Sequence, residues 1–475
     1  MSESISQAAE HLRRDPAGFF GNSITRMHTI PRDELAALQL EAANQCFAEQ
    51  RRTIEMVGKQ AARVGLSTIT QFDDLVPMLF AHSMYKSYPS SLLDKKRFDL
   101  VMRWLSKLTP VDLSGVDVAG CDSIDEWIDR MDAQTPLGLI TSSGTTGTLS
   151  IIPKAKADAI RSMETWRLFF FQRFGTEPRP EDVTPVVDVI WPNHASGKLG
   201  HLRLAALLKT HFTGNDPSRF HALYSDAVST DLMFLASKLQ RAAAKGELDR
   251  LEIDPQLLAR KDEFEALQRR KPEEMKAFLN RMTTQLRGRR IFITGASFLL
   301  VDMAKEGFAR GIEKCFAPDS VCVSGGGTKG MVLPDDWAAQ VKRFLGVREI
   351  KMGYGMSEVS ALHMMCDHRR YHIQPWVIPF VLDPDTNAPL PRTGVQRGRA
   401  GFFDFASIGH WGGTISGDEV EIDWDTPCPC GQTSVHLADD IARYSERRGG
   451  DDKITCAATA EVHNEAVRFL AEFQE

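Results

Sequence analysis

The feature that most constrains this chain is a loop of hydroxyl-bearing and glycine residues between two apolar runs. The loop is Thr141-Ser142-Ser143-Gly144-Thr145-Thr146-Gly147, preceded by Leu137 to Ile140 and followed by Thr148 to Pro153. Glycine lets backbone N–H groups turn inward while Ser and Thr add donors, a combination that can wrap a polyphosphate. A Walker loop needs a lysine directly after its second glycine and a helix behind it, whereas the first lysine here is Lys154, after a second strand-like run. We expect a phosphate-binding loop inside a strand-loop-strand hairpin, with an ordinary surface turn as the alternative.

Composition limits the class of protein. The 475 residues carry 57 basic and 63 acidic side chains, a net charge of -6, and are 43% hydrophobic, so we expect two or three domains with substantial cores. This mildly acidic balance argues against nucleic acid as the main partner. Met1 to Gln7 lacks a signal-like pattern, and no apolar run reaches the roughly 18 residues of a membrane span. Eight cysteines in so long a chain favour free thiols in a reducing cytoplasm over a disulfide framework.

The pattern of apolar residues along the chain changes near Leu137. Before it, Leu35 to Val64 and Arg97 to Leu108 space their apolar residues by three and four, as helices do. After it, short β-rich runs alternate with helical stretches: strands at Val186 to Trp191, Ile291 to Thr294, Ser320 to Val323 and Glu349 to Lys351, and helices at Asp231 to Lys245 and Pro272 to Leu286. This alternation predicts an α/β core with a largely parallel sheet, whose site lies at the carboxyl ends of the strands. We expect a helical N-terminal region over 1–135, the α/β core over 136–440 and a short C-terminal part over 441–475.

A second segment combines an aromatic ring, glycines, a hydroxyl and a carboxylate. It is Lys351-Met352-Gly353-Tyr354-Gly355-Met356-Ser357-Glu358, directly after a β-like run. The alternative is a strand end followed by a helix that Ser357 caps. Two further fragments accompany it: the glycines Gly325 to Gly327 follow a strand-like run, and Thr414-Ile415-Ser416-Gly417-Asp418 lies downstream. Consecutive glycines let a flat ligand lie against bare backbone, although each fragment alone is also compatible with an ordinary turn.

The order of these four fragments resembles the adenylate-forming superfamily, which includes acyl-CoA ligases, firefly luciferases and peptide-synthetase adenylation domains. From Leu79 to Lys453 the chain is most similar to phenylacetate-CoA ligases and to the acyl-protein synthetases of bacterial luminescence. The resemblance implies an adenylate-forming large domain with parallel-rich sheets flanked by helices. It also implies ATP and Mg²⁺ as cofactors and a small carboxylic acid, aromatic or fatty, as substrate.

The resemblance further implies roles for individual residues. Those that would hold the phosphates are Ser142, Ser143, Gly144, Thr145, Thr146 and Gly147, with Lys154 helping to hold the leaving phosphates. Those that would bind adenine are Gly325, Gly326, Gly327, Tyr354 and Gly355. Ser357 would reach the α-phosphate, Glu358 would hold Mg²⁺, and Asp418 would accept hydrogen bonds from both ribose hydroxyls.

Trp191 to His201 resembles the Gly- and His-containing segment that helps to wall the acyl pocket of the ligases. His194, Gly197 and His201 are therefore candidates for the acid site. A hydrogen-bonded structural histidine is the alternative for His194 and His201. Phe169 to Phe171 and Phe298 are further candidates to line a pocket for a ring or a chain.

A cysteine set supports the same branch of the superfamily. Cys428 and Cys430 lie on a tight turn, and Cys366 and His372 lie upstream. One imidazole and three thiolates make the closed tetrahedral shell that structural zinc prefers, so we expect structural Zn²⁺ here. The alternatives are four unconnected side chains, or a set in which His363 or His368 replaces His372.

The C-terminal part departs from the ligases. Arg443 to Ile454 resembles the hinge of their mobile lid, but the usual arginine position falls on Gly449, so Arg447 or Arg448 would act from a shifted register. Only Thr455 to Glu475 follow, which we interpret as a truncated lid without the late lysine. Coenzyme A is the first candidate for the acceptor thiol. Cys456 is the second, because the acyl-protein synthetases charge a cysteine near the C-terminus and pass the acyl group to a partner reductase. A nucleotide-binding relative that has lost catalysis is the third hypothesis.

Overall fold

The computed structural model describes residues 4–143, 148–171, 186–247, 251, 253–325 and 332–444, and of residues 143, 171, 240 and 244 the backbone only. The N-terminal part is helical, as expected. Its helices are α1 (Ile5–Arg14), α2 (Pro16–Phe19), α3 (Ile24–Thr29), α4 (Arg32–Thr53), α5 (Glu55–Val64), α6 (Ser91–Asp94), α7 (Phe98–Leu105) and α8 (Ile124–Gln134). The predicted Leu35 to Val64 stretch forms two helices, because Ile54 leaves helical backbone at φ -110° and ψ 110°.

A six-stranded sheet forms the α/β core. Its strands, in spatial order, are β5 (Phe220–Val228), β4 (Asp188–Gly197), β6 (Ile291–Ala296), β7 (Val321–Gly325), β8 (Ile350–Tyr354) and β9 (His363–Met364). All neighbours pair in parallel except β9, which runs antiparallel to β8. The carboxyl ends of the parallel strands therefore meet at one edge, as the sequence predicted.

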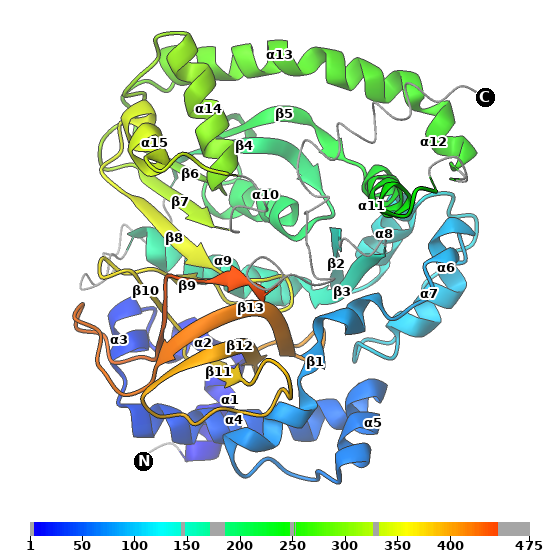
Figure 1. Ribbon diagram of the computed structural model, residues 1–475, viewed down its shortest axis with the longest axis vertical. Coiled ribbons are helices and arrows are strands. Elements are labelled where there is room, and N and C mark those ends of the chain that lie inside the picture. The colour runs from blue at the N-terminus through cyan, green and yellow to red at the C-terminus, as the bar shows by residue number, and fades with distance from the viewer. Residues whose placement is uncertain are drawn as a thin grey trace.

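Helices cover both faces of this sheet (Figure 1). They are α9 (Lys156–Phe171), α10 (Gly200–His211), α11 (Thr230–Lys245), α12 (Pro255–Ala259), α13 (Lys261–Thr284), α14 (Ser297–Ala309) and α15 (Trp337–Leu345). Side chains alternate along β4, so Val189 joins the cluster made with α9, α10 and α11, while Ile190 joins the cluster made with α13, α14 and α15. Burial on both faces explains the apolar runs in β4, β6 and β7.

A second, seven-stranded sheet follows in the chain and differs from the expected parallel-rich pattern. Its strands are β1 (Phe80–Ala81), β10 (Arg370–His372), β11 (Val377–Leu382), β12 (Val395–Asp404), β13 (Gly413–Asp423), β14 (His436–Ala438) and β15 (Ala442–Arg443). Only the β1–β13 pair is parallel. No helix separates the described strands after β8, so neighbouring strands join as antiparallel hairpins.

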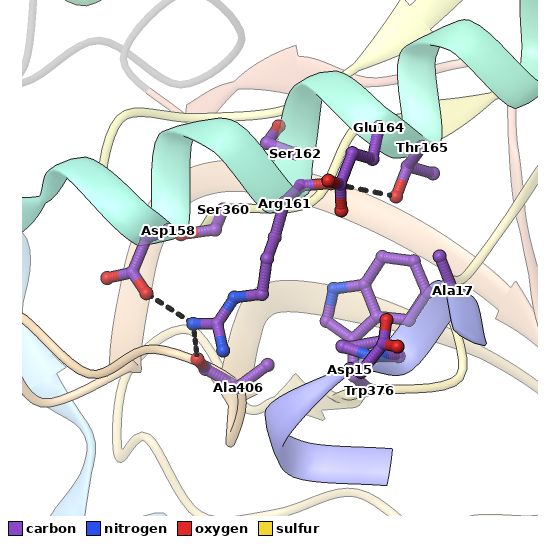
Figure 2. A pocket seen from close by; sticks show the side chains of 11 residues that line it. Asp15, Ala17, Asp158, Arg161, Ser162, Glu164, Thr165, Ser360, Trp376 and Ala406 are labelled. Atoms are coloured by element: carbon purple, nitrogen blue, oxygen red, sulfur yellow. Dashed lines mark hydrogen bonds and ion pairs between the residues drawn. The ribbon is translucent and has the colours of Figure 1, made fainter. Parts of the chain in front are cut away.

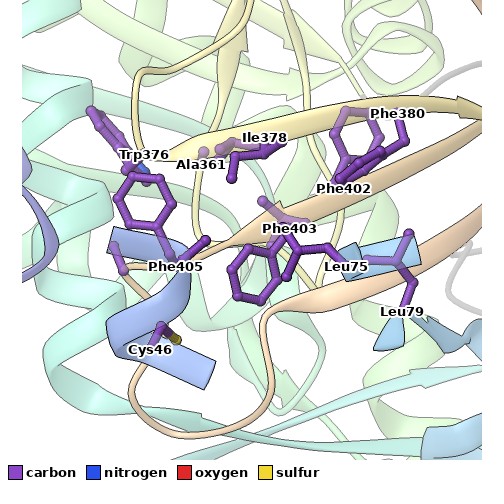
Figure 3. Packing of buried hydrophobic residues seen from close by; sticks show 14 of the residues in the cluster. Cys46, Leu75, Leu79, Ala361, Trp376, Ile378, Phe380, Phe402, Phe403 and Phe405 are labelled. Carbon is purple, nitrogen blue, oxygen red and sulfur yellow. The ribbon is translucent and has the colours of Figure 1, made fainter. Parts of the chain in front are cut away.

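Helices α1 to α5 pack on the second sheet, beneath it in the view of Figure 1, whereas α6, α7 and α8 pack into a separate hydrophobic cluster. Figure 3 shows this core, where Cys46 of α4 faces Phe403 and Phe405, and Phe402 lies beside Phe380. Burial of these rings accounts for the joining of the N-terminal region to a sheet that lies far downstream in the chain.

The expected strand-loop-strand hairpin is confirmed. Strand β2 (Leu137–Ser143) pairs antiparallel with β3 (Leu149–Ala155), in a register from Leu137 opposite Ala155 to Ser143 opposite Leu149. Helix α9 begins directly after β3, so the hairpin lies between α8 and α9 in the chain. Among the described residues, no helix has the length and apolar character needed to cross a membrane.

Candidate active site

A cavity of about 410 Å³ lies at the carboxyl ends of the parallel strands, next to the β2–β3 hairpin. Its apolar lining side chains include Trp166, Trp191, Leu204, Phe298, Leu299 and Leu362. Of the described residues that line it, Lys154 is the only Lys, Arg, Asp or Glu. The cavity therefore combines apolar walls with one ammonium group and with polar side chains such as Asn193 and Ser357.

The cavity brings together residues from several predicted fragments. The predicted site residues that line it are Ser142, Lys154, His201, Gly325, Gly355 and Ser357. Phe298, a candidate for the acid pocket, lines it too, whereas Phe169 and Phe170 pack into a hydrophobic cluster instead. Sequence analysis did not single out Asn193 within the Trp191 to His201 segment, and it missed Thr294, which ends a predicted strand, where sites of parallel sheets form.

His194 and Gly197 are not among the residues that line the cavity. The His194 side chain is buried, with Nδ1 3.1 Å from Oδ1 of Asp226 and its ring 4.8 Å from the ring of Tyr224. A Cβ atom on Gly197 would lie 2.5 Å from Cδ1 of Leu202, so that glycine serves the packing of β4 on α10. The geometry of His194 is thus that of a hydrogen-bonded histidine inside the fold.

Tyr354 and Asp418 are joined directly. The Tyr354 hydroxyl donates to Oδ2 of Asp418 at 2.8 Å, the Ser416 hydroxyl donates to the same oxygen at 2.8 Å, and Nε of Arg443 lies 3.0 Å from Oδ1. Burial, and then the charge of Asp418, holds the pKa of Tyr354 well above its usual range, so the phenol stays neutral and can donate. The two sheets therefore meet at a carboxylate that three side chains surround.

Two glycines near the cavity are required by close packing. A Cβ atom on Gly325 would lie 2.5 Å from the carbonyl oxygen of Gly353, so β7 can approach β8 only with a glycine there. A Cβ atom on Gly200 would lie 2.9 Å from Oγ of Ser357, so the start of α10 comes directly against that hydroxyl.

Ser357 and Glu358 lie in a turn that follows β8, and no helix begins there, unlike in the alternative interpretation of Ser357 as a helix cap. Lys154 reaches this turn from β3 and donates from Nζ to the carbonyl oxygens of Ser357 at 3.3 Å and Val359 at 3.2 Å. Burial lowers the pKa of Lys154, while the negative charges of Asp158, Asp404 and Glu358 oppose that shift. The Glu358 side chain is half-buried and is not among the residues that line the cavity.

The predicted cysteine and histidine set is clustered. One ligand atom from each of Cys366, His372, Cys428 and Cys430 lies within 4.8 Å of the others. The Sγ atoms of Cys366 and Cys428 are 3.6 Å apart, and Sγ of Cys430 is 3.3 Å from Nε2 of His372. Tetrahedral zinc with bonds of about 2.3 Å separates its sulfurs by about 3.8 Å, so this donor set fits the ion. Nδ1 of His372 lies 2.9 Å from Oγ of Ser434, which leaves Nε2 for the metal.

Several predicted residues lie outside the described part of the chain. They are Gly144, Thr145, Thr146, Gly147, Gly326, Gly327, Arg448 and Cys456, together with the side chain of Ser143.

The chain has the fold of the adenylate-forming enzymes, as expected from its sequence. A solved structure of 2-hydroxyisobutyryl-CoA ligase in the postadenylation state, in complex with R3-HIB-AMP, matches 89% of this chain and 71% of its own with a TM-score of 0.52 and 12% identity. The same ligase in an open conformation, with 2-HIB-AMP and CoA, matches 88% of this chain and 76% of its own with a TM-score of 0.48 and 12% identity. ATP-bound MatB from Rhodopseudomonas palustris matches 63% of this chain and 47% of its own with a TM-score of 0.34 and 16% identity. No family model and no curated protein matches the sequence.

Proposed function

We propose that this chain is an ATP-dependent acid–thiol ligase. It activates a carboxylic acid as an acyl adenylate and then transfers the acyl group to a thiol, with coenzyme A as the first candidate. The observation that carries the proposal is the Tyr354–Asp418 hydrogen bond, formed at the end of the strand that leads into Ser357 and the cavity. The fold supports it, and so does the similarity to phenylacetate-CoA ligases and acyl-protein synthetases that the sequence motifs carry.

The chemistry follows from the two half-reactions. In the first, a carboxylate oxygen of the acid attacks the α-phosphorus of ATP, and pyrophosphate leaves with the electron pair of the broken phosphorus–oxygen bond. In the second, a thiolate sulfur attacks the acyl carbon, and AMP leaves as the acyl carbon–oxygen bond breaks. Asp418, paired with Arg443, accepts hydrogen bonds from the ribose hydroxyls, and the Ser357 hydroxyl donates a hydrogen bond to the α-phosphate.

Glu358 is the residue we propose for Mg²⁺. Its carboxylate is a hard oxygen ligand of the kind magnesium prefers, and its half-buried position leaves it partly open. When bound, the ion neutralises charge on the phosphates and stabilises the leaving pyrophosphate.

The acid we propose carries an aromatic or fatty group. Two indole rings and the ring of Phe298 line the cavity, which supports an apolar acyl group.

We also propose a structural zinc ion at Cys366, His372, Cys428 and Cys430. The support is the closed set of four donors, three of them buried, which leaves no position for a substrate. Ser434 strengthens the argument, because it contacts Nδ1 of His372 at 2.9 Å and Nδ1 of His28 at 3.0 Å. Ser434 therefore links His372, one of the proposed ligands, to helix α3, which carries His28.

ATP–pyrophosphate exchange across a panel of aromatic and fatty acids tests the function. We expect exchange with at least one acid, strongly reduced in Asp418→Asn and retained in Glu421→Gln, since Glu421 lies on the same strand with its side chain 3.8 Å from Arg397. No exchange with any acid would leave only nucleotide binding. Cys456→Ser separates the acceptors: retained acyl-CoA formation removes the acyl-protein alternative, whereas loss of a labelled acyl-enzyme that feeds a reductase supports it.

A further inference from the structure

Three successive backbone carbonyls in the Ser357 to Val359 turn are each bound by a buried side chain from elsewhere in the chain. The Lys154 ammonium donates to the first and third carbonyls, at 3.3 and 3.2 Å. The middle carbonyl, that of Glu358, lies 3.0 Å from Nε2 of His410. Because a carbonyl oxygen only accepts, the Nε2 atom of His410 must carry a proton. These three hydrogen bonds therefore restrain the orientation of the peptide groups that carry the carbonyl oxygens of Ser357, Glu358 and Val359.

The turn is also held at its next residue. The Ser360 N–H donates to Oδ2 of Asp404 at 2.8 Å, and the other carboxylate oxygen of Asp404 accepts from the Ala406 N–H at 3.1 Å. Asp404 is the last residue of β12, and His410 lies on the segment that runs from it to β13. That one segment therefore contacts two consecutive parts of the turn.

The segment between β12 and β13 is itself anchored by buried groups. Asp158 accepts the N–H groups of Ile408 and Gly409 at 3.2 Å and pairs with Arg161. Figure 2 shows Arg161 reaching from α9 to both Asp158 and the carbonyl of Ala406. A Cβ atom on Gly409 would lie 2.2 Å from the backbone nitrogen of Ala155, so the segment lies directly against β3.

Burial makes this arrangement costly. The exposed fractions are 8% for Lys154 and 0% for His410, Asp404 and Asp158. Charges and polar groups are stable at such depth only when each is paired or hydrogen-bonded. Hydrophobic side chains could hold the segment between β12 and β13 as firmly as these buried polar groups do. The polar groups are therefore explained best by the backbone that they bind, which carries Ser357 and Glu358.

We propose that His410 is a positioning residue for acid activation. Together with Lys154, it fixes the backbone of residues 357–359, so that the Ser357 hydroxyl and the Glu358 carboxylate project in the directions used for ATP. This role rests on the proposed function. Lys154 acts through the same turn, which it binds with two of its three N–H donors. Small displacements of such groups are expensive, since a shift of about 1 Å costs about 100-fold in rate.

Three variants test the role of His410. His410→Leu removes the donor and keeps the bulk, and His410→Gln offers an amide N–H in place of Nε2–H. Thr109→Val is the matched control, because the Thr109 hydroxyl donates at 2.7 Å to the carbonyl of Gly409, next to His410 but away from the turn. The measurements are pyrophosphate-exchange kinetics and, without nucleotide, amide hydrogen exchange of a peptide spanning residues 355–362.

We expect His410→Leu to lower kcat by about tenfold to 100-fold, as for loss of a buried hydrogen bond, with the KM for the acid nearly unchanged. Amide exchange at 355–362 becomes faster in this variant. His410→Gln restores most of kcat, and Thr109→Val keeps both wild-type values. Equal losses in the leucine and glutamine variants, or an equal loss in Thr109→Val, would overturn the positioning role.

If His410→Leu fails to fold, Lys154→Met tests the same role, because it removes the other side chain that donates to the carbonyls of the turn. Slower adenylation with faster amide exchange at 355–362 is expected, and wild-type values for both overturn the proposal. The two proposals fail separately. A wild-type protein without exchange on any acid refutes the ligase function, whereas an active wild type matched by His410→Leu refutes the positioning role alone.

Discussion

The phenol of Tyr354 donates a 2.8 Å hydrogen bond to the carboxylate of Asp418, a residue 64 positions away in the chain. The same carboxylate accepts from Ser416 and pairs with Arg443. A carboxylate offers about four acceptor sites, and Tyr354, Ser416 and Arg443 already use three of those of Asp418. A ribose that brings two hydroxyl groups must therefore displace one of these partners.

The first prediction concerns this exchange of partners. Tyr354→Phe keeps the ring and frees one acceptor site of Asp418, so the KM for ATP should stay equal or fall. Asp418→Asn removes the charged acceptor and the partner of Arg443, so the KM for ATP should rise by about tenfold or more. Glu421→Gln is the control on the same strand. If Tyr354→Phe weakened ATP as much as Asp418→Asn, the phenol itself would contact the nucleotide.

The second prediction concerns the proposed zinc ion. Purified protein should hold about one zinc per chain, and His372→Ala should lose it, because a closed tetrahedral site requires all four donors. His368→Ala should keep it, since His368 is exposed and lies outside the cluster. Metal content by mass spectrometry, with the thermal midpoint beside it, measures both. Loss of zinc from His368→Ala with retention in His372→Ala would mean that the ligand set is wrong.

Local sequence patterns predicted the parallel sheet and the hairpin well. The strands near Ile291 and Val321 are largely buried apolar runs, and such runs are visible without tertiary information. Glycine and hydroxyl residues after these runs then predicted which edge carries the cavity. The second sheet was harder, because its strands differ from those of the first mainly in lacking helices between them.

Residues that act across the fold left no local signal. His410 and Asp404 contact the 357–360 turn from 52 and 44 residues away, and neither belongs to a recognisable motif. His194 and His201 lie in one predicted segment, yet His201 lines the cavity and His194 does not. They differ because His194 lies on strand β4 and His201 on helix α10. The direction in which the chain turns between these two elements is set by tertiary packing.

The third prediction separates two roles of Gly325. If it is required by the close approach of β7 to β8, Gly325→Ala should destabilise the protein by about 1–3 kcal/mol, because the added methyl group meets the Gly353 carbonyl at 2.5 Å. Gly115→Ala is the control, since nothing lies within 4 Å of its added Cβ atom. Thermal midpoints report the effect. A Gly325→Ala protein of wild-type stability with weakened ATP binding would assign this glycine to the ligand alone.

The last prediction concerns Asp231, whose carboxylate accepts the N–H groups of Ile124 and Asp125 at 2.8 and 3.2 Å. Asp125 in turn accepts the Thr230 N–H at 2.9 Å, so each aspartate caps the helix of the other. Burial, and then the charge of Asp125, raises the pKa of Asp231 from 3.8 to about 7. A raised carboxyl pKa means that the folded state binds the proton more tightly, so this stabilisation is complete below about pH 4 and is lost as pH rises to about 7. The loss is at most about 1.4 kcal/mol per pH unit.

Asp231→Asn isolates this titration, because the amide keeps one acceptor and cannot ionise. The stability of the wild type minus that of the variant should fall steadily between pH 5 and pH 7 and level off above, as followed by thermal midpoints at constant ionic strength. Titrating groups that do not interact with Asp231 cancel in the difference. A difference that stays flat across this range, or that grows with pH, would mean that Asp231 is already ionised near pH 5 and that the N–H groups of α8 outweigh burial and the charge of Asp125.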